Sequence, residues 1–374
     1  MARTLKSDKT LFIATMLLVS ASLVMVYSAS AVQAQAKYHI ANYFLYRQLT
    51  WAVLGTGALF AAMRLDYRKY REPFVIWTLL AVTVVLLLSV FFFAPINGTR
   101  RWMSFGIASV QPSELAKLAV ILFTAALLER RMHRVNEPGY TLLPIGVVTL
   151  SLVSLILFQP DFGTAACIVG IVVAILFAAG LSYRYLFGAL LLIAPAAVLL
   201  VATSDYRYKR WLTYLDPWKD ELGNGFQIIQ SLYAIGSGGL FGKGLMEGVQ
   251  KLYYIPEPHT DFIYAVVAEE FGLVGTTIIL LCFAMIIWRG LRTSLLAQDR
   301  FGALLALGLT MMIGMQALVN ISVVTQLLPT KGLPLPLVSN GGSSLLINLV
   351  SIGMLLNISQ QSSAMASVHA QKNE

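Results

Sequence analysis

Apolar runs of about 20 residues, the length at which a helix crosses the hydrocarbon core of a bilayer, recur along the whole chain. Only 12% of the 374 residues are charged, whereas charged residues make up about a quarter of an ordinary soluble domain. A soluble fold and a single membrane anchor are therefore both excluded. The sequence predicts an all-α polytopic membrane protein with about ten transmembrane helices. The predicted spans are residues 11–31, 44–63, 74–94, 113–129, 141–158, 163–181, 185–203, 261–288, 301–326 and 343–359.

Lysine and arginine residues are divided unequally between the two sets of connecting segments. With the amino terminus inside, the short inner segments hold about 15 of them, among them Arg64, Arg130 and Arg289, and the short outer loops hold about four. This asymmetry follows the positive-inside rule and predicts that both termini are cytoplasmic. It also explains the net charge of +9, because the basic residues form no continuous stripe that would bind nucleic acid.

The first span, which follows Lys6 and Lys9 and ends in small residues, could be a signal peptide or a transmembrane helix. Its apolar stretch is long for a signal, so we expect an uncleaved helix and a single integral membrane domain over residues 1–374. Cys167 and Cys282 lie within apolar spans, where a thiol usually packs as a small hydrophobic group. The histidines show no metal-ligand spacing, so the sequence indicates neither a disulfide nor a metal site.

The longest connection, residues 204–260, joins the seventh and eighth spans on the predicted periplasmic side. Loops of this length are usually functional. Residues 226–233 have the pattern of an amphipathic helix on the membrane, although the basic and aromatic residues of the segment equally fit a wetted loop. Residues 237–244 resemble a phosphate loop, but Ser237 and Gly244 depart from that motif, so we interpret the glycines as turns.

Glu114 and Lys117 lie one helical turn apart at the start of the fourth span. The structural interpretations are a Glu–Lys pair or a lysine that extends its ammonium group to the interface. Because charges within membrane spans are rare without a purpose, we favour a functional role for Lys117. Trp102, in the loop before this span, is by position alone an interfacial anchor. Asp161, between a Pro and a Gly, is by itself more typical of a tight turn than of a catalyst.

Asp261 follows several prolines and Thr260, a potential N-cap, so we expect it in the first turn of the eighth span at the outer interface. Acidic residues are common there because of the helix dipole alone. Glu269 and Glu270 lie about two turns deeper, where we expect them to face a polar interior or to pair with cations such as Lys117.

Residues 329–344, rich in proline and glycine, predict a rigid re-entrant loop, which is tolerated at membrane depth only where it lines protein or a water-filled cavity. Together the polar stretches imply an outward-facing cavity with charges of both signs. Cations such as Arg47, Lys117 and Arg210 suit phosphates, and a carboxylate such as Asp261 suits proton abstraction. This combination favours transfer chemistry on an anionic, lipid-linked substrate, although a transporter could use the same groups.

Several long motifs occur in order: GTRRWMSFG from Gly98, QPSELAKL from Gln111, QPDFGT from Gln159, PEPHTDFIYAVVAEEFG from Pro256 and PTKGLPLPLVSNGGSS from Pro329. Over nearly the whole chain, these motifs and the span layout resemble the SEDS family (shape, elongation, division and sporulation). PTKGLPLP is more similar to the cell-division branch, FtsW, than to the elongation branch, RodA. Asn340 departs from the family's SYGGSS motif, in which a Tyr is usual at this position.

The resemblance implies a peptidoglycan glycosyltransferase that polymerises lipid II at the outer face of the bacterial inner membrane, at the division septum. The family's essential Asp falls on Asp261, which we expect to be catalytic, and its loop Trp falls on Trp102. The further substrate-binding residues that we expect are Arg47, Glu114, Lys117, Asp161, Arg210, His259, Lys331, Ser339 and Ser343.

We expect Asp261 to act as general base on the acceptor 4-hydroxyl, with undecaprenyl pyrophosphate leaving under inversion and with Lys117 and arginines stabilising its charge. No cofactor is indicated with certainty, and a divalent cation, Mg²⁺ or Mn²⁺, stays open. The alternatives are a lipid II flippase, an elongation-type polymerase and a non-catalytic scaffold. The implied partners are lipid II, the nascent glycan strand, a class B penicillin-binding protein, other division proteins and membrane lipids.

Overall fold

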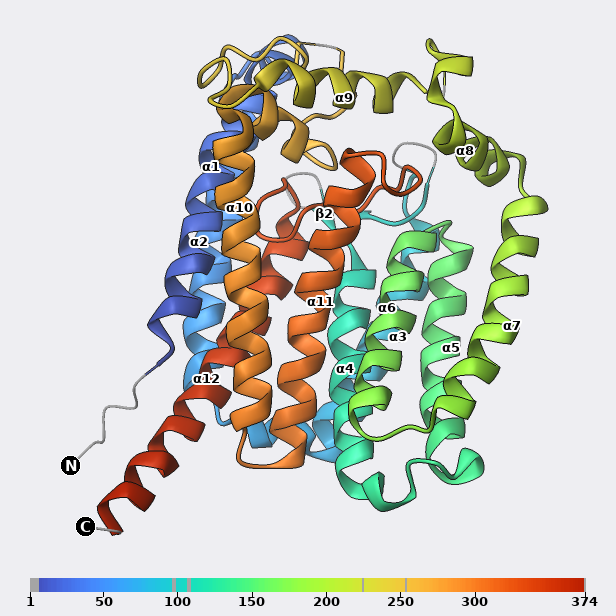
Figure 1. Ribbon diagram of the computed structural model, residues 1–374, viewed down its shortest axis with the longest axis vertical. Helices are drawn as coiled ribbons and strands as arrows, with labels where there is room; N and C mark the ends of the chain where they lie inside the picture. Colours follow the sequence, from blue (N-terminus) through green and yellow to red (C-terminus); the bar gives the residue numbers. More distant parts are fainter. Residues whose placement is uncertain (1–6, 96–98, 106–108, 224, 253, 373–374) are drawn as a thin grey trace.

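The computed structural model describes residues 7–95, 99–105, 109–223, 225–252 and 254–372, so Gly98 and Gly106, the ends of one motif, lie outside the described residues. Helices dominate, and one occupies each predicted span (Figure 1). The α-helices are α1 (Lys9–Tyr38), α2 (Tyr43–Arg64), α3 (Pro73–Ser89), α4 (Pro112–Arg131), α5 (Leu143–Phe158), α6 (Phe162–Ala178), α7 (Tyr183–Ala202), α8 (Asp205–Leu215), α9 (Phe226–Gly238), α10 (Ile263–Leu296), α11 (Arg300–Val324) and α12 (Gly342–Lys372). Short 3-10 or π-helical turns are Tyr67–Arg71, Val90–Phe92, Met132–Arg134, Pro138–Leu142 and Pro217–Asp220.

Within the described residues, six helical segments are long and apolar enough to cross a membrane. They are Lys9–Tyr38, Pro73–Phe92, Pro138–Phe158, Ile263–Leu296, Arg300–Val324 and Gly342–Ser362. Helix α6 and the first part of α7 are apolar but shorter. Length and composition therefore support a multi-pass membrane protein, while the crossing of all ten predicted spans stays a prediction.

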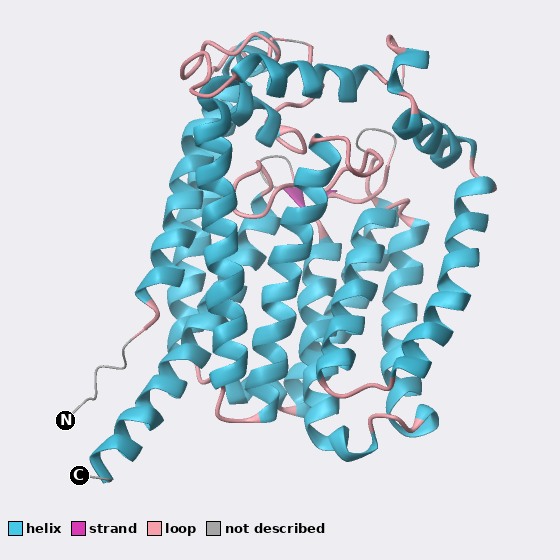
Figure 2. Ribbon diagram, in the orientation of Figure 1, coloured by secondary structure: helices cyan, strands magenta, loops and turns pink. Residues whose placement is uncertain are grey.

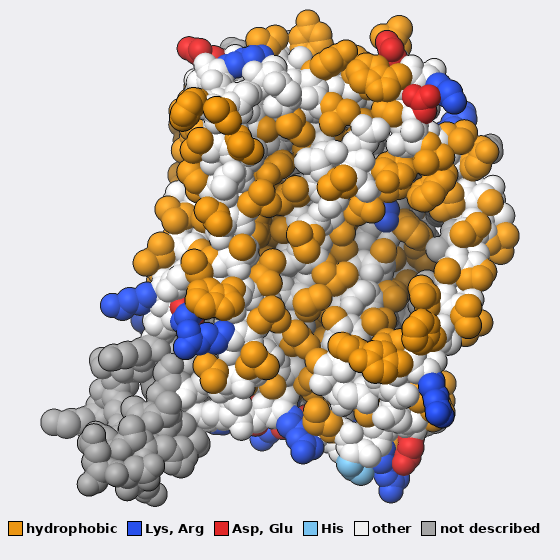
Figure 3. Space-filling model, viewed as in Figure 1, with side chains coloured by type: hydrophobic (Ala, Val, Ile, Leu, Met, Phe, Trp, Pro, Cys, Tyr) orange, Lys and Arg blue, Asp and Glu red, His pale blue; other side chains and the backbone are white. Residues whose placement is uncertain are grey.

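The two ends of the helix bundle differ in structure. We call the end where α1 begins and α12 ends the terminal side, and the opposite end, where α8 and α9 lie, the loop side (Figure 1). Between the two ends, hydrophobic side chains cover the face seen in Figure 3, while most of the lysine and arginine side chains lie near the ends. This distribution is the one expected of a protein whose middle faces lipid.

Non-helical segments gather on the loop side beneath α9 (Figure 2). Among them, β1 (Met103–Ser104) pairs antiparallel with β2 (Ser109–Val110). This short hairpin pairs backbone groups that a plain loop would leave open, and the all-α class of the fold is confirmed.

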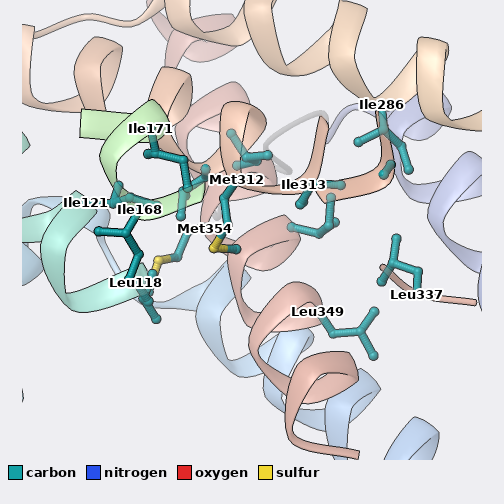
Figure 4. Close-up of a cluster of buried hydrophobic side chains, with 14 of the residues drawn as sticks. Leu118, Ile121, Ile168, Ile171, Ile286, Met312, Ile313, Leu337, Leu349 and Met354 are labelled. Carbon is teal, nitrogen blue, oxygen red and sulfur yellow. The ribbon is translucent and has the colours of Figure 1, made fainter. Parts of the chain in front are cut away.

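Helix α11 is in the interior and packs against α4, α6, α10 and α12. The buried side chains of this core include Ile121 on α4, Ile171 on α6, Met312 on α11 and Met354 on α12 (Figure 4). A helix that is apolar on all sides suits such a position, because neighbours surround it. The core fixes the helices whose loop-side ends carry the polar motifs.

The long segment between α7 and α10 contains two helices. Residues 226–233 do form a helix, α9, whereas α8 was not predicted. After α9, Gly239 and Gly242 adopt positive φ angles of 56° and 79°, which confirms that these glycines form turns. This turn packs against a break in α10 at Gly272, where Leu273 N donates to Gly239 O at 2.9 Å. The loop thus supplies hydrogen-bond partners for a helix that is interrupted.

Candidate functional site

Asp261 lies two residues before the start of α10 on the loop side, and not in the first helical turn where the sequence predicted it. Hydrogen bonds from two other segments hold the backbone at this position. Asn320 Nδ2, on α11, donates to Asp261 O at 2.8 Å and to Leu333 O at 2.7 Å. Ser339 Oγ donates to Thr260 O at 2.5 Å. These bonds join the start of α10 to residues 325–341, the non-helical segment before α12, which matches the predicted re-entrant loop and is buried from Leu333 to Ser339. The backbone of Asp261 is therefore fixed while its carboxylate stays available.

The Asp261 carboxylate has no hydrogen bond or ion pair within the part of the chain that the structure describes. It keeps some accessible surface but lies beneath the surrounding loops. The pKa of Asp261 is raised to about 7, mainly by burial and also by the negative charge of Glu257, although Arg101 and Arg210 lower it. A carboxylate with this pKa is suited to accept a proton near neutral pH. A Cβ at Gly332 would lie 2.9 Å from Asp261 Oδ2, so a larger residue at this position would displace the Asp261 carboxylate.

Arg101 connects the β1 loop to the turn before α6. Its guanidinium group donates to Pro160 O and lies 3.9 Å from Asp161 Oδ1. Asp161 is the N-cap of α6, since Thr164 N donates to its Oδ1 at 3.2 Å. The predicted turn role of Asp161 is thus present, and its carboxylate also accepts a hydrogen bond from Gln111 Nε2 at 3.1 Å. Sequence reasoning did not single out Arg101, although its place beside Trp102 in the RRW triplet was a usable signal.

Two more cations reach this region from other elements. Lys331 Nζ lies 4.5 Å from the centre of the Phe162 ring, and burial lowers the pKa of Lys331. Arg210, on α8, donates from Nη1 to Thr330 O at 3.0 Å. Lys331 thus belongs to the segment before α12, and Arg210 contacts it. The positive charge of Arg210 also lowers the pKa of Asp261. Of the predicted site residues, the structure groups Asp161, Arg210, Lys331 and Ser339 around Asp261.

Lys117 lies inside the bundle and is fully engaged. Its Nζ is 2.9 Å from Glu114 Oε1 and 2.5 Å from Gln316 Oε1, and both charged side chains are only 1% exposed. The Glu–Lys pair considered from the sequence is therefore present, and Gln316 on α11 is a partner that the sequence did not reveal. Gln316 Nε2 also donates to Pro334 O at 3.0 Å. Lys117 is thus connected to the segment before α12 through Gln316.

The remaining predicted residues lie around the edges of this region. His259 is buried against Phe44, with ring centres 4.3 Å apart, and burial lowers its pKa to about 4, so its imidazole is neutral at pH 7. Arg47 Nη2 donates to Ser109 Oγ at 2.5 Å, and Ser343 Oγ accepts from Gln111 N at 3.0 Å. Trp102 directly precedes β1 and is partly exposed.

Glu269 and Glu270 do pair with cations, as expected, but Lys117 is not the partner of either. Lys243 Nζ lies 2.8 Å from Glu269 Oε1, and Lys251 Nζ contacts Glu270 Oε1. The lysines that neutralise these glutamates belong to the long loop, whose position in space the sequence does not give, whereas Lys117 is occupied by Glu114. We call these four side chains, together with Ser28, the glutamate–lysine cluster.

Among the described residues, no group of three or more His, Cys, Asp or Glu side chains is arranged to hold a metal ion. Cations from three elements, Arg101, Arg210 and Lys331, share this region with the carboxylates of Asp261, Glu257 and Asp161. The site can thus take a proton at one carboxylate and hold an anionic group at neighbouring guanidinium and ammonium groups.

The chain is similar to known proteins over nearly its whole length. A family model described as cell cycle protein, covering FtsW, RodA and SpoVE, matches residues 8–364. The "Probable peptidoglycan glycosyltransferase FtsW" of Geobacter metallireducens is 46% identical over 339 residues, which cover 90% of each chain. Stage V sporulation protein E of Bacillus subtilis is 42% identical over 360 residues, covering 95% of this chain and 97% of that protein.

Solved structures are similar over nearly the whole chain. One, described as "Structural coordination of polymerization and crosslinking by a peptidoglycan synthase complex", matches with a TM-score of 0.78 and 33% identity, covering 96% of this chain and 99% of that chain. The rod shape determining protein RodA of Thermus thermophilus matches with a TM-score of 0.70 and 29% identity, covering 96% and 98%.

Proposed function

This chain belongs to the SEDS family of FtsW, RodA and SpoVE, and we propose that it is a peptidoglycan glycosyltransferase that polymerises lipid II at the outer face of the bacterial inner membrane. The observation that supports this function most directly is the Asp261 carboxylate. It is accessible, has a pKa raised to about 7 and is flanked by cations from three elements.

In the proposed reaction, Asp261 accepts the proton of the 4-hydroxyl of the acceptor N-acetylglucosamine. The resulting oxygen attacks the anomeric carbon of the donor, the bond from that carbon to the pyrophosphate oxygen breaks, and undecaprenyl pyrophosphate leaves. One displacement inverts the anomeric configuration. Arg101, Arg210 and Lys331 lie where they would stabilise the charge that develops on the pyrophosphate.

Lys117 takes a different role in this proposal from the one that the sequence indicated. Its charge is balanced by Glu114, and Gln316 connects it to Pro334 in the segment that also holds Thr260. We infer that Lys117 is a positioning residue for this segment. Trp102 and His259 stay candidate substrate contacts at the edges of the site.

The experiment that tests this function combines the purified protein, together with its partner, with lipid II and looks for glycan polymer on a gel. Wild-type protein should form polymer, and Asp261→Asn should bind lipid II but form almost none. Asp216→Asn, an equivalent change at an exposed loop aspartate paired with Lys219, should polymerise normally. Near-normal polymer from Asp261→Asn would contradict the role of Asp261.

Two further measurements, on vesicles and in cells, distinguish the alternatives. A flippase would move lipid II across vesicles without forming polymer. A non-catalytic scaffold would tolerate Asp261→Asn in cells while changes on its surface abolished function.

We further propose that the protein acts in septal wall synthesis with a class B penicillin-binding protein. The support is that several relatives are named FtsW and that one similar structure comes from a complex which couples polymerisation to crosslinking. Expression of this chain in cells depleted of their division polymerase should restore septa. Rescue only of cells depleted of the elongation polymerase would indicate the RodA-type role.

A further inference from the structure

A shallow groove lies between α3 and α4 near the terminal side, far along the bundle from Asp261. Its apolar wall includes Ile76 and Trp77 on α3 and Phe123 and Leu127 on α4. The Trp77 and Phe123 rings meet edge to face with centres 6.0 Å apart, and Trp77 is largely exposed. The groove volume is about 80 Å³, so it holds a short stretch of an acyl chain and not a whole ligand.

Two guanidinium groups border this apolar groove. Arg71, at the start of α3, forms an ion pair with Glu129 at 2.7 Å, which fixes its position while leaving other N–H groups of the guanidinium available. Arg130, at the end of α4, is exposed and has no ion pair within the described part of the chain. The border of the groove therefore has one arginine that is held in place and a second whose charge is not compensated.

We propose that this groove binds an anionic glycerophospholipid of the cytoplasmic leaflet. Its phosphate group contacts Arg130 and Arg71, and the upper part of one acyl chain lies along Trp77 and Phe123. A guanidinium group binds phosphate through two parallel hydrogen bonds, and tryptophan favours the membrane interface because one end of its ring system is polar. The positive-inside rule explains basic residues on this side, but it does not explain why two of them flank an apolar groove that contains an exposed tryptophan.

Native mass spectrometry of the full-length protein, supplied with phosphatidylglycerol or phosphatidylcholine, tests this proposal. We expect phosphatidylglycerol to be retained preferentially, and Arg130→Gln to weaken its retention about fivefold, as the loss of one basic residue at an anionic surface does. Arg134→Gln, a control on the same side, should change nothing because Arg134 pairs with Glu137 outside the groove. Equal retention of the two lipids, or an equal effect of both substitutions, would overturn the proposal.

Fluorescence gives an independent measurement because Trp77 is one of six tryptophans and the only one that lines the groove. Phosphatidylglycerol with brominated acyl chains should quench wild-type protein more strongly than brominated phosphatidylcholine at the same mole fraction. Trp77→Phe should abolish that difference. A difference between the lipids that persists in Trp77→Phe would place the preferred lipid elsewhere and contradict the proposal.

Discussion

Asp261, just before α10, and the Glu269–Glu270 pair, about two turns into this helix, have opposite surroundings. Within the described residues, the Asp261 carboxylate has no direct partner and keeps some accessible surface. Glu269 and Glu270 are fully buried, and each is bound by a lysine of the long loop. Glu269 also accepts from Val249 N at 2.9 Å, and Glu270 accepts from Ser28 Oγ at 2.6 Å.

The difference separates a reactive carboxylate from structural ones. A buried carboxylate that is fully paired cannot accept a proton without losing its bonds, so it serves to hold elements together. In this chain the glutamate–lysine cluster joins the long loop and α1 to the first turns of α10. Asp261, at the entry to those turns, is held through its backbone and leaves its oxygen atoms free for substrate. Five predictions test this division.

The largest effect on activity is expected at Asp261. Asp261→Asn keeps the size and shape of the side chain but removes the base, so polymerisation should fall by about 10² to 10⁴. The melting temperature should not fall below that of wild type, because no described hydrogen bond to the carboxylate is lost. Polymerisation rates and thermal melting of the same preparation measure both quantities. A large drop in melting temperature would mean that Asp261 is structural, like the two glutamates.

The opposite result is expected for Glu270→Gln. It leaves the Lys251 ammonium, only 4% exposed, without a carboxylate, and breaking a buried pair in this way costs about 3–5 kcal/mol. The melting temperature should therefore fall strongly, and activity should fall with the amount of folded protein. The control is Glu137→Gln, since the pair of Glu137 with Arg134 is exposed and should contribute about 0–1 kcal/mol. Equal melting temperatures for the two variants would refute the structural role.

The pH dependence of the rate should reflect Asp261 alone. Because the deprotonated carboxylate is the active form, the rate should increase about tenfold per pH unit below the pKa of about 7 and level off above it. Glu257→Gln removes a negative neighbour and so lowers the pKa of Asp261. The rising part of the pH–rate curve should therefore move to lower pH. If Glu257→Gln leaves the pH–rate curve unchanged, a group other than Asp261 controls the pH dependence of the rate.

Stability should show the opposite dependence on pH. The raised pKa means that the folded state binds the Asp261 proton more tightly than the unfolded state does. The contribution of Asp261 is then full below its ordinary pKa of 3.8 and is lost as the pH rises towards 7. In wild-type protein this loss should lower the melting temperature as the pH rises towards 7, and Asp261→Asn should abolish that decrease.

The smallest effect is expected at Ser28 in α1. Its hydroxyl donates to Glu270 and accepts from Lys251 Nζ at 2.9 Å. Ser28→Ala should therefore cost about 1.5–3 kcal/mol, the range for a hydrogen bond to a charged group. Thermal melting measures the change, and Ser151→Ala, whose exposed hydroxyl bonds only its own helix, is the control. No difference between the two would mean that α1 is not held to α10 by this bond.

Several features of the fold were predictable because they depend on nearby residues. Hydropathy placed a helix at each of the ten predicted spans and gave each helix start within two residues, and the amphipathic pattern identified α9. The ends of α1, α10 and α12 were set too early, because these helices continue 7, 8 and 13 residues beyond the predicted spans. The family assignment from motifs is confirmed by the match over residues 8–364. Helix α8 was missed, since its basic and aromatic residues fit a loop equally well.

The sequence by itself determined the membrane class of the protein, its family and the residue at the centre of the proposed site. Apolar runs and motifs consist of neighbouring residues, so they can be recognised without the tertiary structure. Only the tertiary structure decided which charges meet. Ser28 and Glu270 are 242 positions apart, and Gln316 and Lys117 are 199 apart. A buried charge without a partner is costly, so each one pairs with a polar group that the packing of the helices brings near. No local sequence pattern specifies which group that is.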